Sequence, residues 1–331
     1  MENTPPLVTV ILPVYNRPHV IYTIESILQQ TYKNIDLLII DNASTDNTVE
    51  VIRGIKDSRI RLIVNESNRG QTFSINRGLK LARGTYIARI DSDDFALPSR
   101  IEKQVSFMES HPDYGLVGCW VHYMNDADKL TVLMKMPVTD KGLRFMQEFA
   151  CGVYHSAAMM RKSILDEFHI RYNPDIAMAE DYDMWKQIMQ HSKAQNLGEV
   201  LLYYRRGGSN DSKKYKDTML SESYTVREDI CKLQISDPLA LRQALDCIKL
   251  EKDKYIPIFT AVRIWHYYMQ RLNREIGKFS PDYKIIKLHL VMKFYSSCIS
   301  ENKAFYARFL NCIYRFTLNM RYKIGTERSM V

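Results

Sequence analysis

Three carboxylates follow directly after an apolar run in the segment Tyr86–Asp94. Asp91, Asp93 and Asp94 are so close in the sequence that, as anions, they would repel one another and raise one another's pKa unless a cation lay between them. Their oxygens suit Mg²⁺ or Mn²⁺, which usually take their remaining ligands from water and phosphate groups. The segment therefore favours a divalent metal site, with a solvated acidic loop as the alternative.

Strand and helix patterns alternate before this segment. Four apolar runs predict strands at residues 8–14, 35–40, 60–64 and 86–90, and the first two of these strands are expected to be buried on both faces. Helical periodicity connects them over residues 19–30, 45–55 and 72–83. Ser44 or Thr45 is the expected cap of the second helix, and Gly84 is the expected end of the third. The alternation predicts an α/β fold with a mostly parallel sheet and helices on both faces.

Polar residues stand at the carboxyl ends of three of these predicted strands. They are Asn16, Asp41 and Asp91. Ligands of open α/β sheets bind outside this edge of the sheet, so we expect the three residues to contribute to one site. The alternative is that they are ordinary turn residues, because Asn and Asp favour loops. The sequence contains neither G-x-G-x-x-G nor a P-loop, which argues against a dinucleotide dehydrogenase and a P-loop NTPase.

The composition is that of a globular protein of one large or two modest domains, with 331 residues of which 46% are hydrophobic and 25% charged. The six cysteines are scattered without a C-x-x-C pair, which disfavours a zinc site and a disulfide framework. The first residues lack the basic and apolar regions of a signal peptide, and no run is long enough to span a membrane. We therefore expect a cytoplasmic location.

Positive charge is concentrated after residue 212. Residues 213–331 contain 22 Lys and Arg against 12 Asp and Glu, a net charge of +10, whereas residues 1–212 carry −2. Pro238, Pro257 and Pro281 are expected to break this region into helices. Basic and aromatic residues alternate over Lys284–Arg321. Two interpretations remain open, namely a basic amphipathic helix on an anionic membrane surface and a helical cap on the rest of the chain.

Six motifs occur together and in order in the first two thirds of the chain. They are Val8–Asn16, Asp41–Asp46, Asn68–Gly70, Gly84–Ile87, Asp91–Asp94 with Pro98 beyond it, and Glu180–Trp185. In these motifs the chain resembles glycosyltransferase family 2, inverting enzymes with the GT-A fold in the nucleotide-diphospho-sugar transferase superfamily. The resemblance implies a GT-A catalytic domain over residues 1–212, with a donor-binding half at about 7–120 and an acceptor-binding half at about 121–212. Residues 213–331 would form a basic, aromatic-rich helical region.

The resemblance also implies roles for individual residues on the donor side. Contacts to the nucleotide sugar would come from Pro13, Tyr15, Asn16, Asp41, Asn42, Asn68, Asp91, Ser92, His155 and Arg205. Asp41 or Asn42 would accept the N3 proton of a uracil-like base. Asp93, with Asp91, would ligate Mg²⁺ or Mn²⁺, which stabilises the diphosphate as it leaves.

On the acceptor side, the resemblance implies that Asp181 is the general base and that Glu180 is a neighbour that shapes it. The alternative is an acidic helix start stabilised by the helix dipole. His155 would contact donor phosphate or acceptor, or it is a packed structural residue. Gly207 stands where many relatives carry a His, so Arg205 or Arg206 would answer the diphosphate charge.

The implied function is a metal-dependent, inverting transfer of a sugar from a nucleotide-diphosphate sugar, expected to be a UDP-sugar, to a glycan or lipid-linked glycan. The pathway would be surface polysaccharide biosynthesis, on the cytoplasmic side and with residues 213–331 as the candidate contact to the membrane. One alternative is a sugar-nucleotide pyrophosphorylase, against which the non-glycine loop Pro13–Pro18 argues. A second is a non-catalytic module that binds nucleotide sugars or glycans, against which Asp93 and Asp181 argue.

Overall fold

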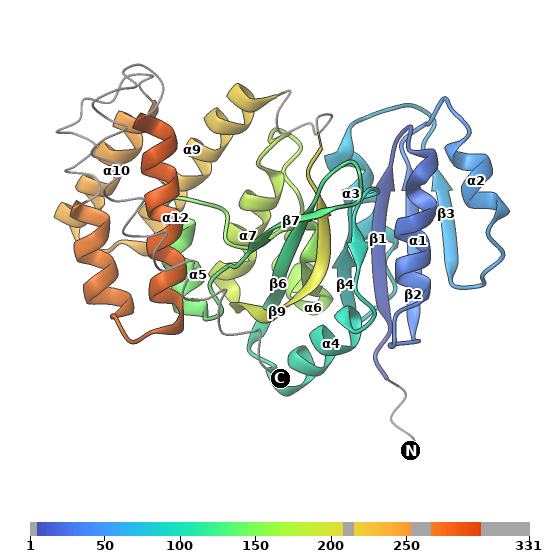
Figure 1. The fold of residues 1–331 in the computed structure, drawn as a ribbon, viewed down its shortest axis with the longest axis horizontal. Helices are drawn as coiled ribbons and strands as arrows, with labels where there is room; N and C mark the ends of the chain where they lie inside the picture. The colour runs from blue at the N-terminus through green and yellow to red at the C-terminus, as the bar shows by residue number, and fades with distance from the viewer. Residues whose placement is uncertain (1–4, 208–214, 253–265, 299–331) are drawn as a thin grey trace. The chain divides into compact units, whose positions relative to one another are not determined.

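The computed structural model describes residues 5–207, 215–252 and 266–298 (Figure 1). The chain forms two compact units, Met1–Ile230 and Cys231–Val331. The boundary lies inside helix α9 (Lys216–Gln234), so the first unit extends beyond the predicted boundary at residue 212. The assignment of residues 1–212 as the catalytic domain stays a prediction.

A nine-stranded sheet forms the centre of the first unit, in the order β3-β2-β1-β4-β8-β6-β9-β5 with β7 paired to β6. Its strands are β1 (Val8–Val14), β2 (Ile35–Asp41), β3 (Ile60–Val64), β4 (Tyr86–Arg89), β5 (Phe95–Ala96), β6 (Tyr114–Met124), β7 (Leu130–Met134), β8 (Met159–Arg161) and β9 (Lys193–Arg205). Strands β1 to β4 pair in parallel, as predicted. Beyond β4 the sheet is mixed, because β8 runs antiparallel to both β4 and β6.

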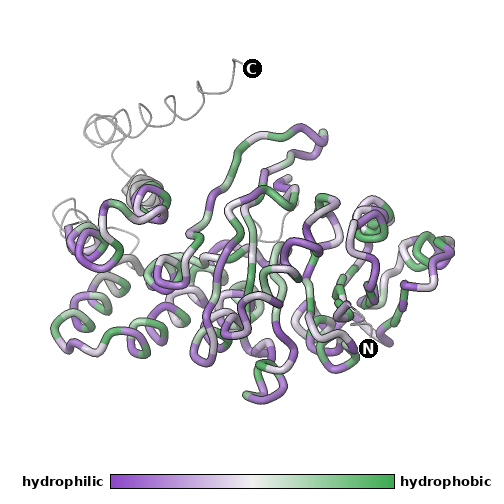
Figure 2. Tube along the Cα trace, turned by 90° about the horizontal axis from the view of Figure 1, so that it is seen from below, coloured by the Kyte–Doolittle hydropathy of each residue, from purple (hydrophilic) through white to green (hydrophobic). Residues whose placement is uncertain are grey.

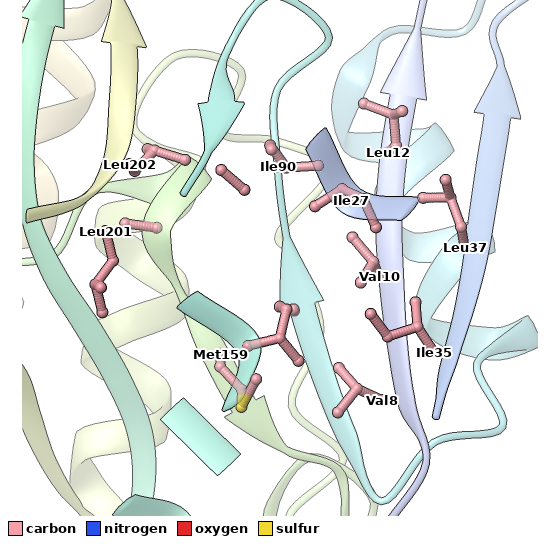
Figure 3. Close-up of a cluster of buried hydrophobic side chains, with 14 of the residues drawn as sticks. Val8, Val10, Leu12, Ile27, Ile35, Leu37, Ile90, Met159, Leu201 and Leu202 are labelled. Atoms are coloured by element: carbon pink, nitrogen blue, oxygen red, sulfur yellow. The ribbon is translucent and has the colours of Figure 1, made fainter. Parts of the chain in front are cut away.

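Helices cover both faces of this sheet, which confirms the predicted α/β layers (Figure 1). They are α1 (Ile21–Leu28), α2 (Thr48–Gly54), α3 (Gln71–Leu81), α4 (Arg100–Ser110), α5 (Asp140–Gln147), α6 (Lys162–Glu167) and α7 (Glu180–His191), with the 3-10 turns η1 (Pro18–Val20) and η2 (His155–Ala157). Successive side chains along β1 point to opposite faces of the sheet, so they belong to two separate cores. Val10 and Leu12 belong to one core with Ile27 of α1 (Figure 3), whereas Ile11 belongs to a second core with Trp185 of α7.

The residues that were predicted to cap α2 and to end α3 do not do so. Ser44 and Thr45 do not cap α2, whose N-cap is Asn47 without a side-chain hydrogen bond. The Ser44 hydroxyl instead donates to Asp41 and accepts from the N–H of Asn16, and the Thr45 hydroxyl accepts from the Asn16 side-chain amide. Gly84 does not end α3, which stops at Leu81. A Cβ at Gly84 would lie 2.5 Å from the backbone nitrogen of Thr9, so glycine is needed here for close approach to the start of β1.

The described part of the second unit contains the end of α9, α10 (Pro238–Lys252), the π-helix η3 (Leu272–Ile276) and α12 (Pro281–Cys298). Pro238 and Pro281 begin helices, as the predicted breaks require, while Pro257 lies outside the described residues. Most of Lys284–Arg321 also lies outside them, so its membrane role stays a prediction. Hydrophilic and hydrophobic residues alternate along the described helices (Figure 2), and none of these helices is both long and apolar enough to cross a membrane.

Candidate functional site

The loops that follow β1 and β2 meet at one edge of the sheet, as predicted for Asn16 and Asp41. The strand register places Val14 beside Asp41. Beyond the strands, the backbone N–H of Asn16 donates to the Ser44 hydroxyl at 2.9 Å, and the N–H of Thr45 donates to Asn16 Oδ1 at 2.8 Å. Asn16 itself is held at φ 48°, in the left-handed region that Asn tolerates. The two loops therefore form one connected wall.

The side chains of Asp41 and Asn42 are committed to this wall. Asp41 is fully buried, and its carboxylate accepts hydrogen bonds from the N–H and hydroxyl of Ser44 at 2.9 and 2.5 Å. Asn42 Oδ1 accepts from the backbone N–H of Arg69 at 3.1 Å, and its amide donates to Asn68 Oδ1 at 2.7 Å. Both residues hold loops together in this structure. The expectation that one of them binds a base stays a prediction, as do the roles of Pro13, buried in β1, and Tyr15, which is exposed.

Asp91 lies just beyond β4 and is bound from two sides. Its Oδ1 forms an ion pair of 2.6 Å with Arg89, whose side chain is buried, and its backbone N–H donates to the Ser156 hydroxyl at 2.9 Å. Burial opposes the ionisation of Asp91. The positive charge of Arg89, together with weaker favourable charges, outweighs the effect of burial, so the pKa of Asp91 lies below its usual value. Asp91 is therefore an anion near neutral pH.

The next two carboxylates, those of Asp93 and Asp94, are disfavoured as anions. Burial, followed by the charge of Asp91, raises the pKa of Asp93 to about 6 and that of Asp94 well above its usual value. Asp94 accepts a hydrogen bond from the backbone N–H of Arg205 at 2.7 Å, which ties it to the end of β9. Within the described part of the chain, no other residue donates a hydrogen bond to the Asp93 carboxylate. Ser92 lies in the turn between Asp91 and Asp93.

The carboxylates fit a metal that arrives together with phosphate groups. Among the residues that the structure describes, no three His, Cys, Asp or Glu side chains converge to hold a metal ion. Mg²⁺ and Mn²⁺ need only one or two protein carboxylates when a diphosphate supplies further oxygens. The Asp93 carboxylate accepts no hydrogen bond from another described residue, and Asp91 has one oxygen outside its ion pair, so these two residues could hold such a cation.

Helix α7 begins with the two acidic residues predicted to serve the acceptor side. Burial raises the pKa of Glu180 to about 8 and that of Asp181 to about 6, so near pH 7 Glu180 is mostly protonated and Asp181 mostly ionised. Asp181 Oδ1 accepts from the backbone N–H of Tyr182 at 2.7 Å, and Oδ2 lies 3.7 Å from the Cys151 thiol. Of the two, Asp181 has the charge state of a general base.

His155 and Ser156 connect the carboxylates after β4 to the start of α7. His155 is buried, with Nε2 at 2.9 Å from the Tyr172 hydroxyl and Nδ1 at 3.8 Å from Glu180 Oε1. Burial and the charge of Arg89 lower the pKa of His155 to about 3, so it is neutral and its contact with protonated Glu180 is not an ion pair. The adjacent Ser156 binds Asp91. The expected contact of His155 with substrate stays a prediction.

The Arg205 side chain binds the loop around Asp93 and the β6–β7 turn. Its guanidinium donates to the carbonyl oxygens of Asp93 at 3.1 Å and Asn125 at 3.0 Å, and it pairs with Asp128 at 2.7 Å. Its predicted diphosphate contact stays a prediction. The exposed Arg206 lies over the Tyr123 ring at 5.0 Å.

Sequence reasoning missed several residues that complete this site. Arg17 lies close enough to Asp91 and Asp93 to lower the pKa of both. Arg89 is the buried partner of Asp91, and a charged residue within an otherwise apolar buried strand is the signal that could have found it. No local pattern in the sequence indicates Ser156 or Cys151.

Comparison with known sequences gives consistent matches. The family model described as Glycosyl transferase family 2 matches residues 9–168. A Methanocaldococcus jannaschii uncharacterized glycosyltransferase is 33% identical over 235 residues, covering 68% of this chain and 80% of the relative. The Escherichia coli UDP-Glc:alpha-D-GlcNAc-diphosphoundecaprenol beta-1,3-glucosyltransferase WfaP is 34% identical over 216 residues, covering 64% and 82%.

Comparison with solved structures agrees. S. aureus TarS 1-349 in complex with UDP-GlcNAc matches with a TM-score of 0.57 and 16% identity, covering 88% of this chain and 81% of that one. The mannosyltransferase PcManGT from Pyrobaculum calidifontis, in complex with GDP-Man and Mn²⁺, matches with a TM-score of 0.52 and 17% identity, covering 98% and 84%. At these identities the likeness concerns the fold, and it confirms the predicted GT-A architecture.

Proposed function

The chain belongs to glycosyltransferase family 2, and from this premise we propose that it transfers a sugar from a nucleotide-diphosphate sugar to an acceptor hydroxyl, with inversion at the anomeric carbon. The observation that carries the proposal is the pairing of two kinds of carboxylate in one site. Asp93 is a carboxylate after β4 whose pKa is raised to about 6, and Asp181 is a mostly ionised carboxylate at the start of α7. The charge of Asp91 raises the pKa of both, which supports their assignment to a single site.

Asp181 acts in this proposal as the general base. The acceptor hydroxyl gives its proton to the Asp181 carboxylate while its oxygen forms a bond to the anomeric carbon of the donor sugar. The bond between that carbon and the diphosphate oxygen breaks on the opposite face, and the nucleoside diphosphate leaves with the electron pair. A pKa of about 6 suits a base that must be ionised near neutral pH yet still accept a proton.

On the donor side, Asp93 and Asp91 would hold Mg²⁺ or Mn²⁺. The metal supplies positive charge for the diphosphate of the leaving group. Arg89 holds the Asp91 carboxylate, and Arg205 holds the backbone of Asp93, so the loop that carries both residues is fixed before the donor binds. PcManGT, which shares the fold, has been solved in complex with GDP-Man and Mn²⁺, and this supports a divalent metal on the donor side.

We propose a UDP-sugar as donor and a lipid-diphosphate-linked glycan as acceptor, in surface polysaccharide biosynthesis. Two E. coli relatives, WfaP and WfgD, are named as glucosyltransferases that use UDP-Glc and a diphosphoundecaprenol-linked GlcNAc. A third, WbnJ, is named for O-antigen biosynthesis. TarS supports the donor class, because it has been solved in complex with UDP-GlcNAc.

The test is a transfer assay with purified full chain, a panel of UDP-sugars, Mn²⁺ or Mg²⁺, and a synthetic polyprenyl-diphosphate-linked GlcNAc. The proposal predicts metal-dependent release of UDP and a product larger by one sugar, with the anomeric configuration inverted by NMR. Binding of UDP-sugar without release of UDP would indicate the non-catalytic alternative. Formation of UDP-sugar from UTP and a sugar phosphate would indicate a pyrophosphorylase.

A further inference from the structure

The segment that leads into α7 is held by a carboxylate from another helix. Glu222 of α9 accepts hydrogen bonds from three consecutive backbone N–H groups. Ala177 donates to Oε1 at 3.1 Å, and Met178 and Ala179 donate to Oε2 at 2.7 and 3.1 Å. The two residues that follow Ala179 are Glu180 and Asp181.

These three bonds hold the segment just before α7, which has no side-chain cap of its own. Ala179 is the N-cap residue of α7 and makes no side-chain cap hydrogen bond, since alanine has no acceptor in its side chain. The N–H groups of residues 177–179 precede the first turn of α7, and the carboxylate that they bind adds an anion near the positive end of the helix dipole. A carboxylate that accepts three such bonds fixes the direction in which the chain enters α7.

Glu222 is itself held in place by other contacts between α9 and the rest of the first unit. Val226 and Ile230 are buried in one cluster with Ala179 and Tyr182. Asp229 pairs with Lys186 of α7 at 3.2 Å, and the Arg227 guanidinium donates to the carbonyl oxygen of Glu148 at 3.0 Å. The carboxylate of Glu222 therefore reaches residues 177–179 from an anchored helix.

We propose that Glu222 is a positioning residue for the general base. It fixes the backbone before Glu180, so that the Asp181 carboxylate faces the acceptor hydroxyl in the reactive orientation. The inference rests on the proposed function, and it extends the machinery of the acceptor side to a helix that the motif-bearing part of the sequence does not include. Within the described residues, the hydrogen bonds of Glu222 go to residues 177–179, none of which is assigned to the donor side, so its loss is expected to affect turnover and not donor binding.

Two substitutions at this position and one control test the proposal in the full chain. Glu222→Ala removes all three acceptors, whereas Glu222→Gln keeps one oxygen for part of the bonds. We expect Glu222→Ala to lower kcat by about 10- to 100-fold, the range expected for a misplaced catalytic group, with KM for the donor unchanged, and Glu222→Gln to be intermediate. Asp229→Asn, which alters the same pair of helices without touching residues 177–179, should keep kcat within about twofold of the unmodified chain.

Hydrogen exchange gives a readout that does not depend on activity. Glu222→Ala should speed exchange of the amides of residues 177–179, while Glu222→Gln gives a smaller increase and Asp229→Asn gives none. Unchanged exchange and unchanged kcat in Glu222→Ala would overturn the positioning role, as would an equal loss of kcat in Asp229→Asn. If the unmodified chain shows no sugar transfer, the proposed function is wrong. The role of Glu222 in catalysis is then wrong as well, even if hydrogen exchange shows that Glu222 holds the segment before α7.

Discussion

The guanidinium of Arg89 lies 2.6 Å from Asp91 Oδ1 and is almost completely enclosed, with 1% of its side chain exposed against 26% for Asp91. The pair thus reaches from the core to the rim of the site. After burial, the Arg89 charge is also the next cause of the low pKa of His155. One buried cation therefore influences the charge state of residues on both the donor and the acceptor side.

Arg89→Met is expected to destabilise the fold. The substitution keeps much of the side-chain volume but leaves Asp91 without its counter-charge, and breaking one partner of a buried pair costs on the order of 3 kcal/mol. Urea unfolding at pH 7.5 measures the change in free energy of unfolding. Arg59→Met removes a partly exposed partner of Asp57 and should cost less than about 1 kcal/mol. Equal losses in the two variants would contradict the importance assigned to the Arg89–Asp91 pair.

Asp93→Asn should separate folding from donor binding. The folded pKa of Asp93 is about 6 against an ordinary value of 3.8, so its contribution favours folding at pH 4 and is lost as the pH rises through 6. At pH 8 without ligands, the Asn variant should therefore be more stable than the unmodified chain, by about 1–3 kcal/mol, and at pH 4 the two should be equal.

The same variant should lose the stabilisation that Mn²⁺ and UDP give together, which a thermal shift measures. Asp113→Asn, at an exposed carboxylate paired with Lys193, is the matched control and should retain it. A full thermal shift in Asp93→Asn would remove Asp93 from the metal site.

The rate of transfer should fall on the acid side of pH 6. Asp181 has a pKa of about 6 and must be ionised to accept the acceptor proton, so kcat/KM should decrease as the pH drops through that value. Glu180, with a pKa of about 8, is already mostly neutral at pH 7. Glu180→Gln should therefore keep kcat at pH 7 within about threefold, since the amide resembles the protonated acid. A loss in Glu180→Gln as large as in Asp181→Asn would show that Glu180 works as an anion.

Gly84→Ala tests the close approach between β1 and the turn before β4. The added Cβ would meet the backbone nitrogen of Thr9 at 2.5 Å and the carbonyl oxygen of Leu7 at 2.7 Å, and backbone atoms in a sheet cannot easily move aside. We expect a loss of about 2 kcal/mol or more in the free energy of unfolding. Gly54→Ala, where the new Cβ meets nothing within 4 Å, should be neutral or slightly stabilising. Similar effects at both positions would contradict this account of Gly84.

The central strands and the meeting of their polar ends could be predicted because they depend on local patterns. Residues 8–14 and 60–64 are strands over the predicted range, and α7 begins at Glu180 as predicted. An apolar, β-branched run marks each of the two strands and a helical periodicity marks α7, and a single sequence displays both signals directly. Asn16 and the loop at Asp41 met for the same reason, since parallel strands end at one edge.

What could not be predicted depends on contacts between residues far apart in the chain. Ser156 binds Asp91 across 65 positions, and Glu222 binds Met178 across 44. No periodicity connects such pairs. The role of Asp41 in base binding stays a prediction, and the structure shows its carboxylate bonded to Ser44, three residues further along the same loop.

Asp181→Asn is the measurement that tests the central claim most directly. The amide keeps the size of the side chain but cannot take the acceptor proton, so kcat for transfer from UDP-sugar to the lipid-linked acceptor should fall by about 10²- to 10⁴-fold. The thermal shift with UDP and Mn²⁺ should remain, because Asp181 is not assigned to the donor, and the exposed Asp166→Asn variant should transfer normally. Transfer by Asp181→Asn at close to the unmodified rate would contradict the account.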